Sequence, residues 1–193
     1  LLAIVELTSA VLLAVQALRA MVVVLVMVVE EEAVVEVEKC TEEVKMKGSC
    51  LCGGIEFEII DFSGKIYQCH CTLCRKQGGS SSNTGTIVPK SQLNWLSGEK
   101  LIKTWTKDTG FTSSFCICCG SLVPNALRKL EYYWVPVGAL DNDATHRGIF
   151  QIVASLYIDS SAGWALVSPN GARYETMPEV SELLVLLDHQ LHS

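Results

Sequence analysis

The chain has 193 residues and a formal net charge of −6, from 15 lysines and arginines against 21 aspartates and glutamates. This length is enough for one domain with a sizeable hydrophobic core. An acidic chain without a stripe of lysine and arginine argues against nucleic acid as a partner, and equally against adsorption to a membrane through a basic patch.

Residues 1–45 differ in composition from the rest of the chain. Residues 1–29 are rich in Leu, Val and Ala, and Glu30, Glu31 and Glu32 follow them. The uninterrupted apolar run covers only residues 20–29, whereas a membrane-spanning helix needs roughly 20 residues. Neither a basic leading region nor a small-residue cleavage site of a signal peptide is evident. We therefore expect an extension, or a stretch of unreliable sequence, over 1–45 and a folded domain over 46–193. A membrane anchor is the alternative for 1–45.

Seven of the nine cysteines fall into three clusters at the spacing of metal ligands: Cys50-x-Cys52, Cys69-x-Cys71-x-x-Cys74 and Cys116-x-x-Cys119. Two pairs can close a four-thiolate zinc site, and a triplet leaves one coordination position open. Closed zinc sites are structural and open ones can be catalytic, so the pattern suggests two zinc ions, one that holds the fold and one that meets a substrate. Disulfides are disfavoured because the paired cysteines are too close in sequence for long-range links. Reduced cysteines that bind metal predict a cytoplasmic protein.

The segments around the cysteines predict mostly strands. Gly53 and Gly120 follow cysteines, and glycine permits the dihedral angles that turn backbone N–H groups toward thiolates. Alternating apolar residues over 55–59 predict a strand that runs out of the first pair. We predict further strands rich in β-branched and aromatic residues, and a C-terminal helix over 178–191, where Leu183, Leu184 and Leu187 share one face. These further strands cover 66–69, 86–88, 101–106, 132–137 and 149–158.

For several residues near the triplet, the sequence allows more than one role. Arg75 and Lys76 could receive a carboxylate of the substrate, or could be ordinary solvated charges. His70 could be a ligand or a proton shuttle, but we expect it to point away from the thiolates that flank it. The glycine- and serine-rich segment 78–83 is either a connector or the rim of a peptide-binding site. Cys118 is expected to point away from the metal, and the tryptophans to lie in the core or in a pocket wall.

Three ordered motifs resemble one known family. These are Gly48-Ser49-Cys50-Leu51-Cys52-Gly53-Gly54, Cys69-His70-Cys71-Thr72-Leu73-Cys74-Arg75-Lys76 and Phe115-Cys116-Ile117-Cys118-Cys119-Gly120-Ser121. Together with Val137-Gly138-Ala139-Leu140-Asp141, Trp164 and Tyr174-Glu175-x-x-Pro178, they resemble the glutathione-dependent formaldehyde-activating enzyme family, which includes the centromere protein V domain. The resemblance covers about residues 46 to 180 and is specific for the family rather than for a substrate.

The resemblance implies a mainly β fold of coiled antiparallel sheets around a structural four-cysteine zinc site. It implies that Cys50, Cys52, Cys116 and Cys119 hold the structural zinc, and that Cys69, Cys71 and Cys74 hold a catalytic zinc. The implied activity is that of a carbon–sulfur lyase, which condenses glutathione or another small thiol with formaldehyde or a related small aldehyde. A non-catalytic thiol carrier or interaction module, and a purely structural two-zinc protein, are the alternatives.

The chain departs from the family pattern in one loop. The family usually has a Pro-x-x-His-Ile-Phe segment, whereas this chain reads Asp143-Ala144-Thr145-His146-Arg147-Gly148-Ile149-Phe150. Because the proline is missing and the histidine is displaced, we expect His146 to be a surface loop residue rather than a catalytic one.

Overall fold

A computed structural model describes residues 45–141 and 148–189 of the chain. The predicted extension, apart from Lys45, lies outside the described residues, as do Cys40 and His146. Within the described ranges, no helix is both long enough and apolar enough to span a membrane.

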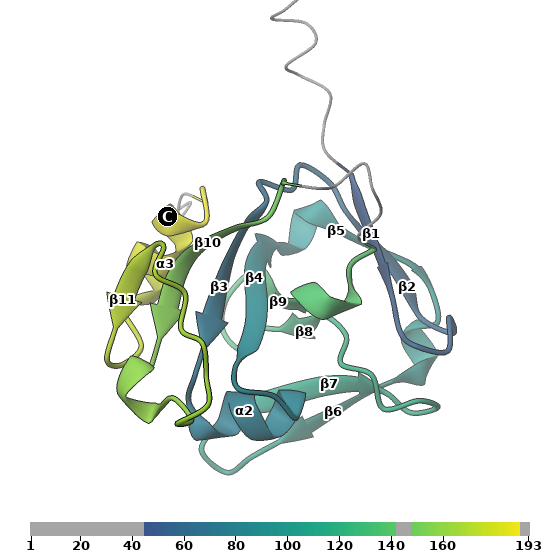
Figure 1. Cartoon of the computed structure of the whole chain (residues 1–193). Coiled ribbons are helices and arrows are strands. Elements are labelled where there is room, and N and C mark those ends of the chain that lie inside the picture. Colours follow the sequence, from purple (N-terminus) through teal and green to yellow (C-terminus); the bar gives the residue numbers. More distant parts are fainter. Residues whose placement is uncertain (1–44, 142–147, 190–193) are drawn as a thin grey trace, which may run out of the picture. The chain divides into compact units, whose positions relative to one another are not determined.

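Most of the described strands belong to one six-stranded sheet (Figure 1). Its strands follow the order β11 (Ala172–Tyr174), β10 (Gln151–Leu156), β3 (Lys65–Cys69), β4 (Asn83–Pro89), β9 (Tyr132–Pro136) and β8 (Asn125–Ala126). The three-stranded sheet contains β1 (Met46–Ser49), β2 (Glu56–Ile59) and β5 (Leu93–Ser97), and a hairpin pairs β6 (Ile102–Thr106) with β7 (Thr112–Cys116).

Helical segments are short. The α-helices are α2 (Thr72–Gly78) and α3 (Val180–Leu186). Single 3₁₀ turns cover η1 (Lys90–Gln92), η2 (Glu99–Leu101), η3 (Val137–Ala139) and η5 (Ile158–Ser160). The mainly β fold with a short C-terminal helix is therefore confirmed, and the predicted strands match β2, β3, β4, β6, β9 and β10 to within a few residues at each end.

The six-stranded sheet is mixed rather than wholly antiparallel. Strand β3 pairs antiparallel with β4, as expected, but β10 pairs parallel with both β3 and β11. Parallel neighbours need a long connection, and the whole stretch from α2 to the loop before β10 separates β3 from β10 in the chain. The side chains of Tyr67 and Cys69 lie in register with those of Ala154 and Leu156, which places the first cysteine of the triplet in the core of this sheet.

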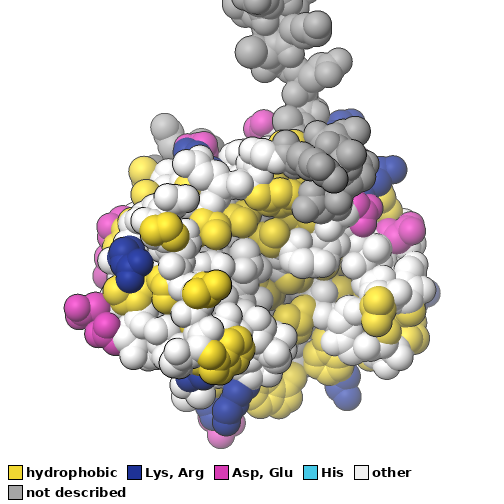
Figure 2. All heavy atoms as spheres, in the orientation of Figure 1, with side chains coloured by type: hydrophobic (Ala, Val, Ile, Leu, Met, Phe, Trp, Pro, Cys, Tyr) yellow, Lys and Arg dark blue, Asp and Glu magenta, His cyan; other side chains and the backbone are white. Residues whose placement is uncertain are grey.

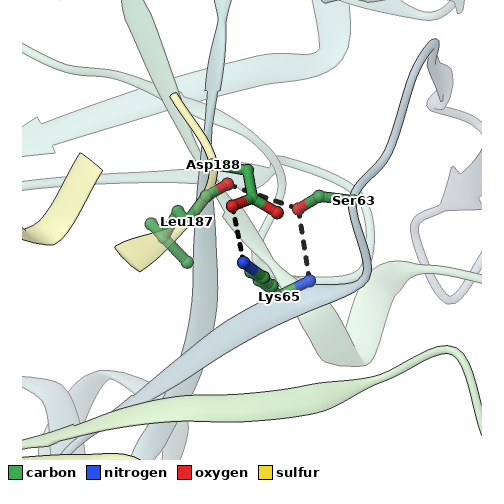
Figure 3. A network of polar contacts seen from close by, with 4 residues as sticks. All are labelled: Ser63, Lys65, Leu187 and Asp188. Carbon is green, nitrogen blue, oxygen red and sulfur yellow. Dashed lines mark hydrogen bonds and ion pairs between the residues drawn. The ribbon is translucent and has the colours of Figure 1, made fainter. Parts of the chain in front are cut away.

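Helix α3 covers the core beside β10 with the apolar face that the sequence predicts. Leu183, Leu184 and Leu187 are fully buried, and they pack with residues of the six-stranded sheet. Figure 3 shows how the end of the helix is held: the Lys65 ammonium pairs with the Asp188 carboxylate, and the Ser63 hydroxyl donates a hydrogen bond to the Leu187 carbonyl at 3.3 Å. Because an exposed ion pair adds little, the buried leucines supply most of the attachment.

A second and a third apolar cluster join the remaining elements. The larger one fills the space between the three-stranded sheet and the six-stranded sheet, around Phe57, Val88 and Val135. The smaller one consists of Cys50, Ile55, Cys116 and Val123, so two cysteines of the four-sulfur set are themselves core residues. On the face shown in Figure 2, acidic and basic side chains lie scattered toward the margin, with both signs present.

Candidate functional site

Two cysteine pairs that are far apart in sequence meet at one point. The sulfurs of Cys50, Cys52, Cys116 and Cys119 all lie within 4.8 Å of one another. Cys52 Sγ is 3.5 Å from Cys50 Sγ and 3.9 Å from Cys116 Sγ. A tetrahedral zinc with Zn–S bonds of about 2.3 Å requires sulfurs about 3.8 Å apart. The four sulfurs therefore fit a single tetrahedral ion.

The two loops that carry these pairs are closed in the same way. The Cys50 N–H bonds to the Ile55 carbonyl at 3.0 Å, and the Cys116 N–H bonds to the Ser121 carbonyl at 2.9 Å. Each loop contains one glycine at positive φ, 70° at Gly53 and 75° at Gly120, as the sequence predicts. The Ile55 N–H points at Cys50 Sγ at 3.3 Å. Backbone donors of this kind stabilise thiolates.

Ser121 connects the two loops. Its hydroxyl oxygen accepts the Leu51 N–H at 3.0 Å and lies 3.3 Å from Cys119 Sγ. The hydrogen bond with Ser121 lowers the pKa of Cys119 to about 6, so this sulfur is a thiolate at neutral pH. Cys118 is exposed and stands outside the group, as expected.

The cysteine triplet forms a second group at the junction of β3 and α2. The sulfurs of Cys69, Cys71 and Cys74 lie within 4.8 Å of one another. Cys69 ends β3, and Cys71 is the N-cap of α2, where its sulfur accepts the Cys74 N–H at 3.4 Å. Cys74 lies one turn into the helix, so the strand end and the first helical turn together bring the three sulfurs to one side.

The three thiols affect one another's ionisation. A hydrogen bond from Cys74 lowers the pKa of Cys69 to about 6, although burial opposes this shift. The same hydrogen bond, together with burial, raises the pKa of Cys74. One proton therefore leaves easily, while further deprotonation puts like charges side by side. A bound cation would remove this penalty, so the triplet also has the chemistry of a metal site.

The triplet opens into a cavity of about 340 Å³. Besides the three cysteines, its wall has a polar part (Gln77, Asn83, Thr112, Asn125, Arg128) and an apolar part (Tyr67, Leu73, Gly110, Phe111, Leu127, Trp134, Leu156, Tyr157, Met177). The four-cysteine group contributes no residue to this wall. The two cysteine groups thus differ in surroundings: all three cysteines of the triplet line this cavity, whereas in the four-cysteine group Cys52 is exposed and Cys50 lines a second, more polar cavity.

Two tyrosines line this cavity close to the sulfurs. Burial and the negative charge of Cys69 raise the pKa of both Tyr67 and Tyr157, so both phenols stay protonated at neutral pH. Tyr157 follows β10 in a left-handed conformation with φ 57°. A bulky residue at positive φ is uncommon and often marks a functional site. Of the four tryptophans, Trp134 is the one in the cavity wall, and its indole ring packs over Gly85, which has no side chain to obstruct it. Trp95 packs against the core around Phe57, but the expectation of a core or pocket position is wrong for Trp105 and Trp164, which are exposed.

The two basic residues after the triplet and the histidine within it do not line the cysteine-lined cavity. Arg75 Nε donates to the His70 carbonyl at 3.2 Å, Lys76 is exposed, and neither side chain lines the cysteine-lined cavity. Their role as carboxylate receivers stays a prediction. The His70 side chain is outside the sulfur group and fully buried, and within the described chain neither ring nitrogen has a hydrogen-bond partner.

The glycine- and serine-rich segment lies beside a different cavity. Gly79 caps α2 in the left-handed conformation, and β4 begins at Asn83. Gly78, Ser80 and Ser82 line a more polar cavity with residues of η3, and only Asn83 reaches both cavities. The helix α2 itself was not expected, because Thr72–Gly78 buries no side chain and so has no apolar stripe to predict it from.

Two comparisons with known proteins found similarity to this chain. The model of the family described as "Glutathione-dependent formaldehyde-activating enzyme" matches residues 45–159. The match ends before Trp164 and the Tyr174–Pro178 segment, which the resemblance had included. A crystal structure of a Rhodobacter sphaeroides protein is similar, with 26% sequence identity, a TM-score of 0.43, and coverage of 55% of this chain and 97% of that one. No curated protein matches the sequence.

The matched residues contain β1 to β10, both sulfur groups and most of the cavity wall. The family match spans more than half of the chain. The chain therefore belongs to the glutathione-dependent formaldehyde-activating enzyme family.

Proposed function

We propose that the chain is a zinc-dependent carbon–sulfur lyase of the cytoplasm that condenses glutathione, or a similar small thiol, with formaldehyde or a related aldehyde. The observation that carries this proposal is the opening of the Cys69, Cys71 and Cys74 sulfurs into a cavity. Three ligands leave one position for a substrate, as in catalytic zinc sites. Family membership supports the choice of thiol and aldehyde.

The four-cysteine group has the proposed structural role. Cys50 and Cys116 are buried, and their loops are closed by backbone hydrogen bonds. With four sulfurs present, no position remains for a substrate. We infer that one zinc ion held here fixes the two loops, and through them the ends of β1 and β7.

The second zinc, when bound by the triplet, would hold the substrate's sulfur and keep it deprotonated. In the condensation, this sulfur attacks the carbonyl carbon, a C–S bond forms, the π pair of the carbonyl moves to oxygen, and the proton lost from the thiol ends on that oxygen. Phe111, Leu127 and Trp134 give the cavity an apolar wall, and charge interactions are stronger beside apolar groups than in open water.

We propose that the phenol of Tyr157 donates a hydrogen bond to the oxygen on which charge develops. Tyr157 lines the cavity. Burial and the negative charges of the three cysteines raise the pKa of its phenol, so the hydroxyl stays protonated. A neutral hydroxyl near a developing alkoxide donates a hydrogen bond that strengthens as the negative charge grows. Tyr67, which lines the cavity with its pKa also raised, is more deeply buried and packs with the sheet core.

Replacing Tyr157 with Phe is expected to lower kcat by roughly 10- to 100-fold, because one donor to the developing oxyanion is lost. The affinity for glutathione should stay within about twofold, since the thiol-binding sulfurs are untouched. The matched control is Tyr174→Phe. The Tyr174 hydroxyl donates a hydrogen bond to Glu182 Oε1 at 2.7 Å, and Tyr174 does not line the cavity. An unchanged kcat, or a loss of glutathione affinity that accounts for the whole defect, would rule out this role.

The proposed activity is tested by the rate of exchange between free glutathione and its formaldehyde adduct, measured by NMR at equilibrium. The condensation also proceeds without a catalyst, so the expected result is an exchange rate that rises in proportion to enzyme and saturates with glutathione. Saturable binding of glutathione without any rate enhancement would contradict catalysis and indicate a thiol carrier instead.

A further inference from the structure

The cysteine-lined cavity contains one cationic side chain among the described residues of its wall, that of Arg128, and no acidic one. Its other polar members are amides, the hydroxyls of Thr112, Tyr67 and Tyr157, and the three cysteine sulfurs. Arg128 is exposed, so solvent screens part of its charge, but it is the cation of this wall toward which an anionic group would be drawn. The cavity therefore offers a ligand a thiol-binding group and a separate positive charge.

Arg128 is held at the cavity by two turns. It lies in the β8–β9 hairpin, where the Leu127 N–H bonds to the Tyr132 carbonyl at 2.9 Å. Its guanidinium lies against Gly110 in the β6–β7 turn. A Cβ atom at Gly110 would be only 3.0 Å from Arg128 Nη1. No hydrogen bond or ion pair joins this guanidinium to another described residue. Its donors therefore remain available to a ligand.

The amides of the wall, by contrast, are engaged with neighbouring side chains. Asn83 Nδ2 donates to Gln77 Oε1 at 2.8 Å, and Gln77 Nε2 donates to Ser113 Oγ at 2.8 Å. Asn125 Nδ2 donates to Thr112 Oγ1 at 2.8 Å. These bonds fix the shape of the wall but supply no charge. Among the described residues of the wall, Arg128 is thus the one that can offer a positive charge to an anionic group.

We propose that Arg128 binds a carboxylate of the thiol substrate and makes the cavity selective for thiols that carry one. A guanidinium presents two parallel N–H donors, which match the two oxygens of a carboxylate. The thiol would meet the Cys69, Cys71 and Cys74 group at one part of the cavity while the carboxylate meets Arg128 at another. This inference rests on the proposed function, because it assumes that the triplet receives a thiol.

Calorimetric titration of the zinc-loaded full chain with glutathione and with glutathione diethyl ester tests this role. The two ligands share the thiol and the peptide scaffold, but the ester lacks both carboxylate charges. Arg128→Gln is expected to weaken glutathione on the order of tenfold, the effect of losing a charged hydrogen bond. The affinity for the ester should stay within about twofold, and Arg128→Lys should recover part of the affinity for glutathione.

Lys129→Gln is the matched control, because Lys129 follows Arg128 in the same turn, is exposed, and does not line the cavity. Both variants change the net charge equally, so equal weakening by both would overturn the proposal in favour of a general charge effect. A defect in Arg75→Gln rather than in Arg128→Gln would assign the carboxylate to Arg75 instead.

If the native chain binds thiols but does not prefer glutathione to its ester, the role proposed for Arg128 is wrong while the proposed function still stands. If it binds neither, the proposed function fails with it.

Discussion

Replacing Cys119 with Ser is expected to abolish the cooperative thermal transition of the domain. Cys119 supplies one of four sulfurs that join the Cys50–Ile55 loop to the Cys116–Ser121 loop. Structural zinc contributes about 10–16 kcal/mol of apparent binding free energy in small zinc peptides. That range is comparable with the whole free energy of unfolding of a domain, about 5–15 kcal/mol. Circular dichroism during heating measures the effect, and a strong chelator should reproduce it in the unchanged chain.

The control for this change is in the same loop. Cys118→Ser removes a thiol one residue away that is exposed and outside the sulfur group. The melting temperature of this variant should stay close to that of the unchanged chain, because surface substitutions rarely alter stability by more than about 0.5 kcal/mol. A Cys119→Ser protein that melts like the Cys118→Ser protein would contradict a structural role for the four-cysteine group.

Replacing Cys71 with Ser is expected to remove one zinc ion and the activity while the fold stays intact. Serine is among the best N-cap residues, so it can replace the bond that Cys71 Sγ makes with the Cys74 N–H at the start of α2. It is a much poorer zinc ligand than a thiolate, and the open site has only three sulfurs. The zinc content should fall by one ion per chain, and the turnover rate by at least about a hundredfold.

Zinc content, turnover and the thermal transition are therefore measured on the same preparation of Cys71→Ser, beside Cys118→Ser as the control for loss of a thiol. An unchanged melting temperature with one zinc lost and no turnover is the expected combination. Full turnover after the loss of one zinc would separate the activity from the triplet. Unfolding of Cys71→Ser would show that both cysteine groups are structural.

Sequence spacing predicts the sulfur groups well because each ligand pair is local. Cys50 and Cys52 share one turn, as do Cys116 and Cys119, and glycine is needed in each turn at positive φ. Which pair joins which is a tertiary property, and only the family resemblance indicated it. Strands are predictable for the same reason, since alternation of apolar residues such as those in β2 is a local pattern.

The cavity wall cannot be predicted in this way. Arg128, Phe111 and Tyr157 come from three loops or strand ends that are separated in the chain, and each has an ordinary local sequence. Their proximity depends on how the β6–β7 hairpin and the β8–β9 hairpin fold against the six-stranded sheet. Sequence analysis singles out Arg75 and Lys76 because they follow the triplet directly, but adjacency in sequence does not place a side chain in a cavity. The positive φ of Tyr157 also has no signal in the sequence.

The pairing of β10 and the burial of His70 are tertiary features as well. An apolar strand pattern over 149–158 does not distinguish a parallel from an antiparallel neighbour, because both bury the same residues. His70 lies between two cysteines that face the cavity, directly after the end of β3, and its side chain is fully buried outside the sulfur group. Sequence alone indicated that His70 points away from the sulfurs but not that it is buried.

X-ray absorption at the zinc edge tests the central claim most directly: a closed site and an open, thiol-accepting site in one chain. The protein would be purified without chelator and measured with and without glutathione. We expect two zinc ions per chain with an average of about 3.5 sulfur ligands each, rising to about 4 when glutathione is added, because the substrate's sulfur completes the open site. A single zinc ion with four sulfur ligands, unchanged by glutathione, would contradict it.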